Sequence, residues 1–441
     1  MCPRRCRKRA EAWPKTGGGS NGALVSFGSE NLLVNKHNEI ENNHMKASKI
    51  LLTGLLALST AGVTQAQTVV HITGSTAFRN ATVSAITNIL EPGFTFAYSG
   101  TSFTGANQAI FSGTAIATGG PVTIKTSWSG AAGGVQAVVQ QLPITTWLTN
   151  TTLQSTGGTP SAPAVYDTPA PAEVSMDDGI QATTPLPNVS SPVLNVQNVG
   201  AVTFKFVKNI GAPAGLTNMT PLLAQALWAN GSLPLSMWTG DTNDATNIVY
   251  ATGRDPDSGT RKVTFLETGI QNFVTGVTPT TVLQYQPTNA SGVVNRANPG
   301  AITGQQPWPV DTVDSVTFAL GDAGYSSGGD LAQAMKTSSP FIYVTYLGLS
   351  DSTTAITGGA TALNWNGIGY SDAAIQNGQY TFWAYEQLGY LPTYGTTDAN
   401  GKAVADSLAQ QIISVDAALA GELLSTMNVT RTQEGGPVTP Q

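Results

Sequence analysis

Three short segments rich in Gly, Ser and Thr each separate a β-branched run from a stretch whose apolar residues have helical spacing. They are residues 74–77 (Gly-Ser-Thr-Ala), 129–133 (Ser-Gly-Ala-Ala-Gly) and 258–260 (Ser-Gly-Thr). A turn that opens a helix exposes N–H groups without helical partners at the positive end of the helix dipole, so it can bind an anion without any net cation. Ser and Thr are also ordinary helix caps, and for any single segment capping is the simpler interpretation.

The third segment is the most specific of the three because basic residues surround it. Arg254 precedes Ser258 by four positions, and Arg261 and Lys262 follow. The chain from residue 67 onward has only eleven basic residues, and three of them fall here. A guanidinium beside a helix N-terminus can hold two oxygens of a tetrahedral anion. The alternative is a surface arginine that pairs with a neighbouring aspartate of the loop.

The elements that must position these turns alternate along the chain. β-Branched runs predict strands at 68–72, 122–128, 202–207, 248–251 and 341–346, and helical spacing predicts helices at 77–90, 134–142, 219–229, 261–266, 380–389 and 403–424. Thr217-Asn218 is expected to cap the helix at 219–229, residues 148–172 and 275–310 read as insertions, and 435–441 as a frayed tail. Alternating strands and helices predict an α/β fold with parallel or mixed sheets covered by helices, and ligands bind where strand ends meet helix starts.

The segment that begins at Met45 has the pattern of a secretory signal peptide. Lys46 and Lys49 precede a short apolar run, and small residues lead to Thr64-Gln65-Ala66. The apolar run is far shorter than the roughly 20 residues of a membrane-spanning helix. We therefore interpret 45–66 as a signal peptide and 1–44 as an upstream extension that arises from a misassigned start. The alternative is a basic extension with a role of its own.

Composition excludes several classes of function for residues 67–441. They hold eleven basic and 22 acidic residues, which argues against nucleic acid or an anionic membrane as a partner. Both cysteines, Cys2 and Cys6, precede the predicted cleavage site, and His71 is the only histidine after it. We expect no disulfide, thiolate nucleophile, histidine-based metal site or cofactor. A soluble periplasmic or secreted protein fits these features best.

Four segments resemble a known family. Residues 250–261 (Tyr-Ala-Thr-Gly-Arg-Asp-Pro-Asp-Ser-Gly-Thr-Arg) resemble the arginine-then-Ser-Gly-Thr motif of the periplasmic phosphate-binding proteins of ABC transporters. Residues 72–78 resemble the opening Gly-Ser-Thr loop of that family, 216–219 the segment before its arginine motif, and 377–380 its Asn-Gly-X-Tyr element. The segments occur in the family's order and span almost the whole predicted mature chain.

The resemblance implies the two-lobed type II periplasmic-binding-protein fold, in which each lobe is a mixed sheet flanked by helices. Residues 67–200 plus 345–441 would form lobe 1 and residues 201–344 lobe 2, with the ligand in the cleft between them. The ligand-binding residues that it implies are Ser75, Thr76, Ala77, Phe78, Ser129, Gly130, Asp178, Arg254, Ser258, Gly259 and Thr260.

The aspartate in that set has a physical purpose. The family's aspartate follows a serine, and residues 174–178 (Val-Ser-Met-Asp-Asp) match best, with Asp178 preferred and Asp177 as the second choice. A carboxylate accepts a hydrogen bond from a protonated phosphate oxygen, whereas it repels fully ionised sulfate. A solvated turn before Gly179 is the structural alternative.

The resulting hypothesis is a non-enzymatic, monomeric binding protein that captures inorganic phosphate or a related oxyanion for an ABC transporter permease. A secreted surface or adhesive protein that reuses the same fold is the first alternative. A secreted phosphatase that uses Ser258 or an aspartate is the second, and the scarcity of histidine and cysteine argues against it.

Overall fold

The computed structural model of the chain describes residues 67–100, 102–150, 165–271, 281–313 and 316–441. The extension expected at 1–44 and the signal peptide expected at 45–66 lie outside the described residues, as does most of the insertion at 148–172. The described residues form a mixed α/β structure, as the alternation of strands and helices predicts.

A mixed sheet forms the centre of the structure, and in the described residues it has 12 strands in the order β2-β3-β4-β1-β5-β18-β6-β15-β9-β8, with β16 and β19 also paired to β6. The strands are β1 (Thr68–Gly74), β2 (Thr95–Tyr98), β3 (Gln108–Thr114), β4 (Pro121–Ser127), β5 (Val174–Asp177), β6 (Asn195–Lys208), β8 (Ser232–Pro234), β9 (Ile248–Ala251), β15 (Ile342–Gly348), β16 (Thr361–Ala362), β18 (Trp383–Tyr390) and β19 (Gly421–Glu422). β1 runs parallel to β4 and β5, and β15 parallel to β9.

The long strand β6 joins two halves of this sheet. It pairs with β18 over Asn195–Thr203 and with β15 over Phe204–Lys208. A buried aromatic group packs where the two halves meet, and Phe206 lies within 6.2 Å of the ring centres of Trp228, Trp365 and Phe382. Burying each such side chain contributes about 1.5–3 kcal/mol to folding.

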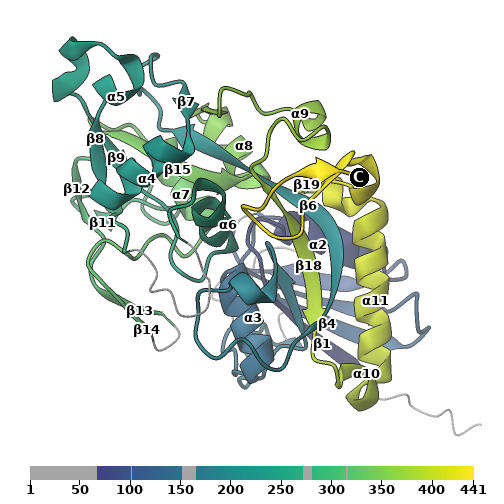
Figure 1. Cartoon of the computed structure of the whole chain (residues 1–441). Coiled ribbons are helices and arrows are strands. Elements are labelled where there is room, and N and C mark those ends of the chain that lie inside the picture. The colour runs from purple at the N-terminus through teal and green to yellow at the C-terminus, as the bar shows by residue number, and fades with distance from the viewer. Residues whose placement is uncertain (1–66, 101, 151–164, 272–280, 314–315) are drawn as a thin grey trace, which may run out of the picture. The chain divides into compact units, whose positions relative to one another are not determined.

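Helices cover the sheet. They are α2 (Arg79–Asn88), α3 (Ala131–Gln140), α4 (Pro221–Asn230), α5 (Ser236–Thr239), α6 (Gly259–Thr268), α7 (Gly328–Met335), α8 (Leu349–Thr357), α9 (Asp372–Gln376), α10 (Tyr394–Thr397) and α11 (Ala399–Ser414). Three of them (α2, α3 and α6) begin at the turns that the sequence predicts. α3 packs on β1 and β5, whereas α11 packs on β1 and β6. Figure 1 shows α3 and α11 on either side of these strands.

Small sheets complete the described chain. They are β10 (Tyr285–Asn289) with β11 (Gly292–Val293) and β12 (Gly304–Pro307), β13 (Asp311–Val313) with β14 (Val316–Phe318), β7 (Asn218–Met219) with β17 (Asn364–Trp365), and β20 (Val429–Thr430) with β21 (Thr439–Pro440). The insertion predicted at 275–310 therefore holds strands of its own over its described part.

The strands predicted at 68–72, 122–128, 202–207, 248–251 and 341–346 are confirmed, as are the helices that follow the first four of them. Four other predictions are wrong. Residues 380–389 form strand β18 instead of a helix, and the helix predicted at 403–424 ends at Ser414. Thr220 caps α4 instead of Thr217-Asn218, because its side chain accepts a hydrogen bond from Leu223 N and Pro221 starts the helix. The predicted frayed tail pairs as β21 with β20.

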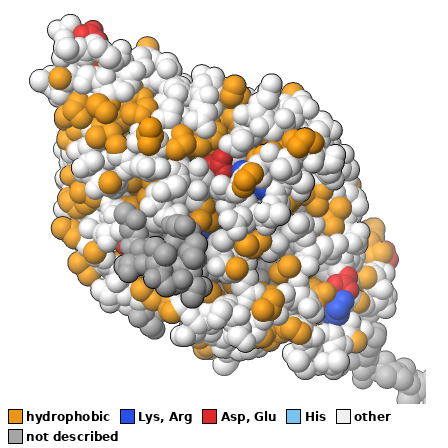
Figure 2. All heavy atoms as spheres, viewed as in Figure 1, with side chains coloured by type: hydrophobic (Ala, Val, Ile, Leu, Met, Phe, Trp, Pro, Cys, Tyr) orange, Lys and Arg blue, Asp and Glu red, His pale blue; other side chains and the backbone are white. Residues whose placement is uncertain are grey.

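The face of the molecule in Figure 2 carries few charged side chains. Many charged side chains are instead buried in the interior. Seven of the eleven basic residues after residue 66 are buried, namely Arg79, Lys125, Lys208, Arg254, Arg261, Lys262 and Arg431. Charged side chains are seldom buried without a partner. A buried basic residue without a carboxylate partner is therefore a candidate for ligand binding.

Candidate anion-binding site

The loop between β1 and α2 supplies the first part of the site. Gly74 has φ +120°, and a Cβ there would lie 2.1 Å from Met176 O, so only glycine fits this close approach to β5. The parallel pairing of β1 and β5 therefore places Ser75 beside Asp178, and the Ser75 hydroxyl donates a hydrogen bond to the Asp178 carboxylate. Phe78 N donates to Ser75 Oγ at 3.0 Å. Thr76, Ala77 and Phe78 are buried beside Ser75.

One of the two predicted residues in the turn before α3 contacts the loop between β1 and α2. Gly130 is buried, its N–H donates to Gly74 O at 3.1 Å, and a Cβ at Gly130 would lie 2.3 Å from Asp257 O. Ala132 N in the first turn of α3 donates to the same Asp257 carbonyl at 2.9 Å. Gly130 therefore lies between the first and third predicted segments. Ser129 is exposed, so its side chain is not buried with the others.

The segment from Arg254 into α6 supplies the third part. Ser258 caps α6 by accepting a hydrogen bond from Arg261 N at 3.2 Å, and Thr260 is buried in the first turn. A Cβ at Gly259 would lie 2.7 Å from Asp178 Oδ2, so the start of α6 touches the aspartate carboxylate. The carboxylate thus lies at the positive end of the α6 dipole.

Arg254 bridges the third segment to the first. Its side chain is 1% exposed, and Nη1 donates to Thr76 Oγ1 at 3.1 Å. Nε donates to Tyr325 O at 2.8 Å, and Nη2 donates to Ser326 O at 2.9 Å. All three partners are neutral oxygen atoms. In the part of the chain that the structure describes, no ion pair joins Arg254 to a carboxylate.

Five of the other buried basic residues differ from Arg254 in this respect. Each contacts a carboxylate, in the pairs Arg79–Asp351, Lys125–Asp167, Arg261–Asp322, Lys262–Asp177 and Arg431–Glu267. The remaining one, Lys208, donates to Pro213 O and lines a surface groove. A fully buried cation with only neutral partners is costly to the fold, so Arg254 has the character of a binding residue.

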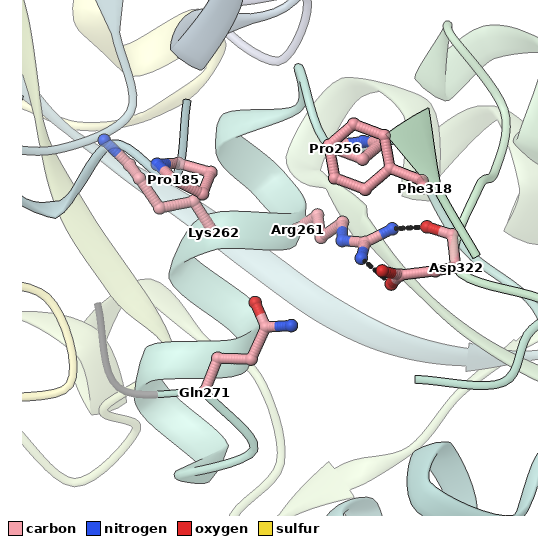
Figure 3. A pocket seen from close by; sticks show the side chains of 7 residues that line it. All are labelled: Pro185, Pro256, Arg261, Lys262, Gln271, Phe318 and Asp322. Carbon is pink, nitrogen blue, oxygen red and sulfur yellow. Dashed lines mark hydrogen bonds and ion pairs between the residues drawn. The ribbon is translucent and has the colours of Figure 1, made fainter. Parts of the chain in front are cut away.

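The other two basic residues of the motif serve structural contacts. Figure 3 shows Arg261 turned toward Asp322 and Lys262 turned toward Pro185, around a cavity of about 50 Å³. Arg261 Nη2 lies 2.5 Å from Asp322 Oδ1, and Arg261 Nη1 also donates to Arg254 O at 3.1 Å. Arg261 therefore braces the backbone of Arg254.

Lys262 enters a group of four buried carboxyls, which we call the carboxyl cluster: Asp177, Asp178, Glu386 and Glu434. Lys262 Nζ donates to both Asp177 oxygens at 2.9 and 3.1 Å and lies 4.0 Å from Glu434 Oε1. Burial raises the pKa of Asp177 to about 7 although the Lys262 ammonium opposes the shift. Burial also raises the pKa of Asp178, and its hydrogen bonds to Glu386 and Ser75 oppose that shift.

Sequence analysis missed two members of the carboxyl cluster. Glu386 lies in β18, which the sequence predicts as a helix, and Glu434 immediately precedes the segment predicted as a frayed tail. One signal was present for Glu386. A single carboxylate in the otherwise uncharged run 380–390 is expensive to bury and therefore a candidate for function.

Neither a metal site nor a membrane-spanning helix emerges from the described residues. They contain no group of three or more His, Cys, Asp or Glu side chains placed to hold a metal ion. None of the helices among residues 67–441 that the structure describes is both long and apolar enough to cross a membrane.

The described structure is similar to several solved structures at low sequence identity. No family model and no curated protein matches the chain. An ABC-type phosphate transport receptor from Vibrio cholerae aligns with a TM-score of 0.42 and 10% identity over 79% of this chain and 98% of that one. A phosphate-binding protein from Stenotrophomonas maltophilia gives 0.43 and 13% over 82% and 92%. Oxidised OxyR from Corynebacterium glutamicum gives 0.32 and 10% over 86% and 73%. Similarity at this level assigns the chain to no family.

Proposed function

We propose that the chain is an exported, non-enzymatic binding protein that captures inorganic phosphate or a similar oxyanion and delivers it to an ABC transporter permease. Its lobes would be residues 67–200 plus 345–441 and residues 201–344. The first lobe would contribute Ser75, Thr76 and Asp178, and the second Arg254 and the Ser258–Thr260 turn. The predicted signal peptide supports export to the periplasm or beyond.

The buried guanidinium of Arg254 carries this proposal. Its direct hydrogen-bond partners are all neutral, and a bound oxyanion would compensate its charge through two parallel hydrogen bonds. The start of α6 lies beside Asp178 and would add N–H donors, whereas Ala132 N at the start of α3 already donates to Asp257 O. Affinity would then come from preorganised donors rather than from excess positive charge.

Asp178 supports phosphate over sulfate. It is buried next to the start of α6, where a protonated oxygen of the anion could donate a hydrogen bond to it. Sulfate carries no proton at neutral pH, so its oxygens would meet the carboxylate with repulsion.

The test is calorimetric titration of residues 67–441, purified, unfolded to release bound ligand and refolded. We expect phosphate to bind at one site per chain and sulfate to give no comparable heat at neutral pH. Circular dichroism in the near ultraviolet shows that the titrated protein is folded. Folded protein that binds neither ion would refute the proposal and favour a secreted surface or adhesive role.

A further inference from the structure

The carboxyl group of Glu386 has an unusual environment. The side chain is fully buried, and among the described residues no N–H group and no hydroxyl donates a hydrogen bond to either carboxyl oxygen. The carboxyl group of Asp178 lies close enough to interact with it. Two carboxyls can form a hydrogen bond only when one of them holds a proton.

The strand pairing explains why these two carboxyls meet. β18 runs antiparallel to β5 with Gln387 opposite Asp177, so Glu386 comes level with Asp178 just beyond the end of β5. On its other edge β18 pairs with β6, and the register shifts between Glu386 and Gln387. Bulges of this kind redirect a side chain and are common beside functional sites.

The charges around Glu386 leave it without a cation of its own. Asp177 and Asp178 face it from the end of β5, and Lys262 faces it from α6. Lys262 already donates to Asp177 and lies 4.0 Å from Glu434, which comes from the C-terminal segment. Burial, followed by the negative charge of Asp178, raises the pKa of Glu386 well above its usual range. Burial therefore favours a proton on the Glu386–Asp178 pair.

Asp178 is the link between Glu386 and the candidate site. Its carboxylate accepts a hydrogen bond from the Ser75 hydroxyl, contacts Gly259 at the start of α6 and interacts with the Glu386 carboxyl. These contacts fix both the orientation and the charge of the carboxylate. A second ionised carboxylate at the same place would repel an incoming anion.

We propose that Glu386 is a positioning residue that shares one proton with Asp178 and thereby limits the pair to a single negative charge beside the bound oxyanion. The inference rests on the proposed function and deepens it. It makes Glu386 a determinant of anion affinity although its side chain does not touch the anion. Loss of the shared proton would add one negative charge to the site and weaken binding by about tenfold or more.

The first experiment detects the proton without any ligand. Infrared difference spectra between the wild type and Glu386→Gln, from pH 6 to pH 10, should show the C=O stretching band of a protonated carboxylic acid at pH 8. Glu91→Gln is the matched control, because Glu91 is exposed and should contribute no such band at that pH. Absence of the band from the Glu386→Gln difference spectrum at pH 8 would overturn the proposal.

The second experiment measures phosphate affinity by calorimetry in the same variants. Glu386→Gln keeps a neutral donor to Asp178, so at pH 7 its affinity should stay within about threefold of the wild type. Glu386→Leu removes the donor and should lose about tenfold or more. Thermal unfolding shows whether each variant is folded. If Glu386→Leu does not fold, the affinity of Glu386→Gln alone tests the proposal. Equal losses in the two variants would mean that a hydrogen-bond donor at this position does not support binding, and higher affinity in both would mean that Glu386 is ionised; either result contradicts the proposal.

The two experiments are linked through pH. The ratio of wild-type affinity to Glu386→Gln affinity cancels the titration of phosphate itself, and it should fall in the pH range in which the infrared band disappears. If the band persists to pH 10, the ratio should stay constant to pH 10. A ratio that changes in a different pH range would contradict the proposal. Protein that shows the band but binds phosphate in no variant would refute the proposed function and leave the shared proton intact.

Discussion

Arg254 and Lys262 are two fully buried cations that are eight positions apart and lie in opposite charge environments. Arg254 donates to two carbonyls and one hydroxyl, all of them neutral. Lys262 enters a cluster of four carboxyls, contacts Asp177 directly and has Glu434 at 4.0 Å. In the first environment no carboxylate contacts the cation directly, and Asp178 acts on Arg254 only from beyond hydrogen-bond distance. The second environment has more carboxyls than cations.

The two charge environments predict different effects of mutation, one on the stability of the fold and the other on ligand affinity. An ion pair such as Lys262–Asp177 is completed within the chain, so its removal should act on folding. The direct partners of Arg254 in the described chain are neutral, so its removal should act mainly on the anion that binds it. The same short segment of sequence therefore serves both purposes, and variants can tell them apart.

The largest effect is expected for Lys262→Met. The change leaves Asp177 and Glu434 buried without their cation, and breaking a buried pair from one side costs about 3–5 kcal/mol. Urea unfolding at pH 8 measures the loss. Lys402→Met is the control, because Lys402 pairs with Asp406 on the surface and should cost less than about 1 kcal/mol. Similar losses in both variants would show that the carboxyl cluster does not depend on Lys262.

The second prediction concerns pH and the Lys262 environment. The folded protein raises the pKa of Asp177 from 3.8 to about 7, so between these values folded Asp177 holds a proton that unfolded Asp177 has released. The free energy of unfolding should therefore fall, by a few kcal/mol, as pH rises from about 4 to 7, and the contribution of Asp177 should level off above that range. Asp177→Asn should lose this part of the slope in urea unfolding at pH 5, 6, 7 and 8. An unchanged slope in Asp177→Asn would assign the titration to the other carboxyls.

The sequence predicted one of these two environments much better than the other. The Arg254 environment lies at strand ends that β-branched runs mark clearly. Ser75, Thr76, Gly130 and Arg254 meet because they follow strands β1, β4 and β9 of one sheet. Local patterns were enough to find those turns. The choice of Asp178 as the site's aspartate came from the family resemblance, and it remains a prediction.

The carboxyl cluster was not predictable in the same way. β18 pairs with β5 on one edge and β6 on the other, and its side chains are mostly buried on both faces of the sheet. It therefore lacks the alternation of apolar and polar residues that marks a half-exposed strand. Glu386 was consequently assigned to a helix. Glu434 is buried because Ile180 N and Thr183 in a distant segment hold its carboxylate, and no local pattern indicates such a contact.

The third prediction returns to the first environment. Arg254→Ala should reduce phosphate affinity on the order of 100-fold, because a charged partner in a buried pair is worth about 2–5 kcal/mol to binding. Its free energy of unfolding should fall less than that of Lys262→Met, since only neutral hydrogen bonds are lost from the fold. Calorimetry and urea unfolding measure the two quantities, with Lys402→Met as the control for net charge. Undiminished affinity in folded Arg254→Ala would remove Arg254 from the site.

The smallest effect on stability is expected for Thr76→Val, a variant that tests whether the anion binds next to Nη1 of Arg254. Valine has nearly the shape of threonine but removes the acceptor of Arg254 Nη1, so a buried N–H loses its partner. Without phosphate we expect a loss of about 1 kcal/mol in the free energy of unfolding, and Thr76→Ser should restore most of it. An anion oxygen beside Nη1 would replace the missing acceptor, so the loss should shrink in saturating phosphate. A loss that is the same with and without phosphate would mean that the anion does not approach this N–H, and that the charge of Arg254 acts on it only from a distance.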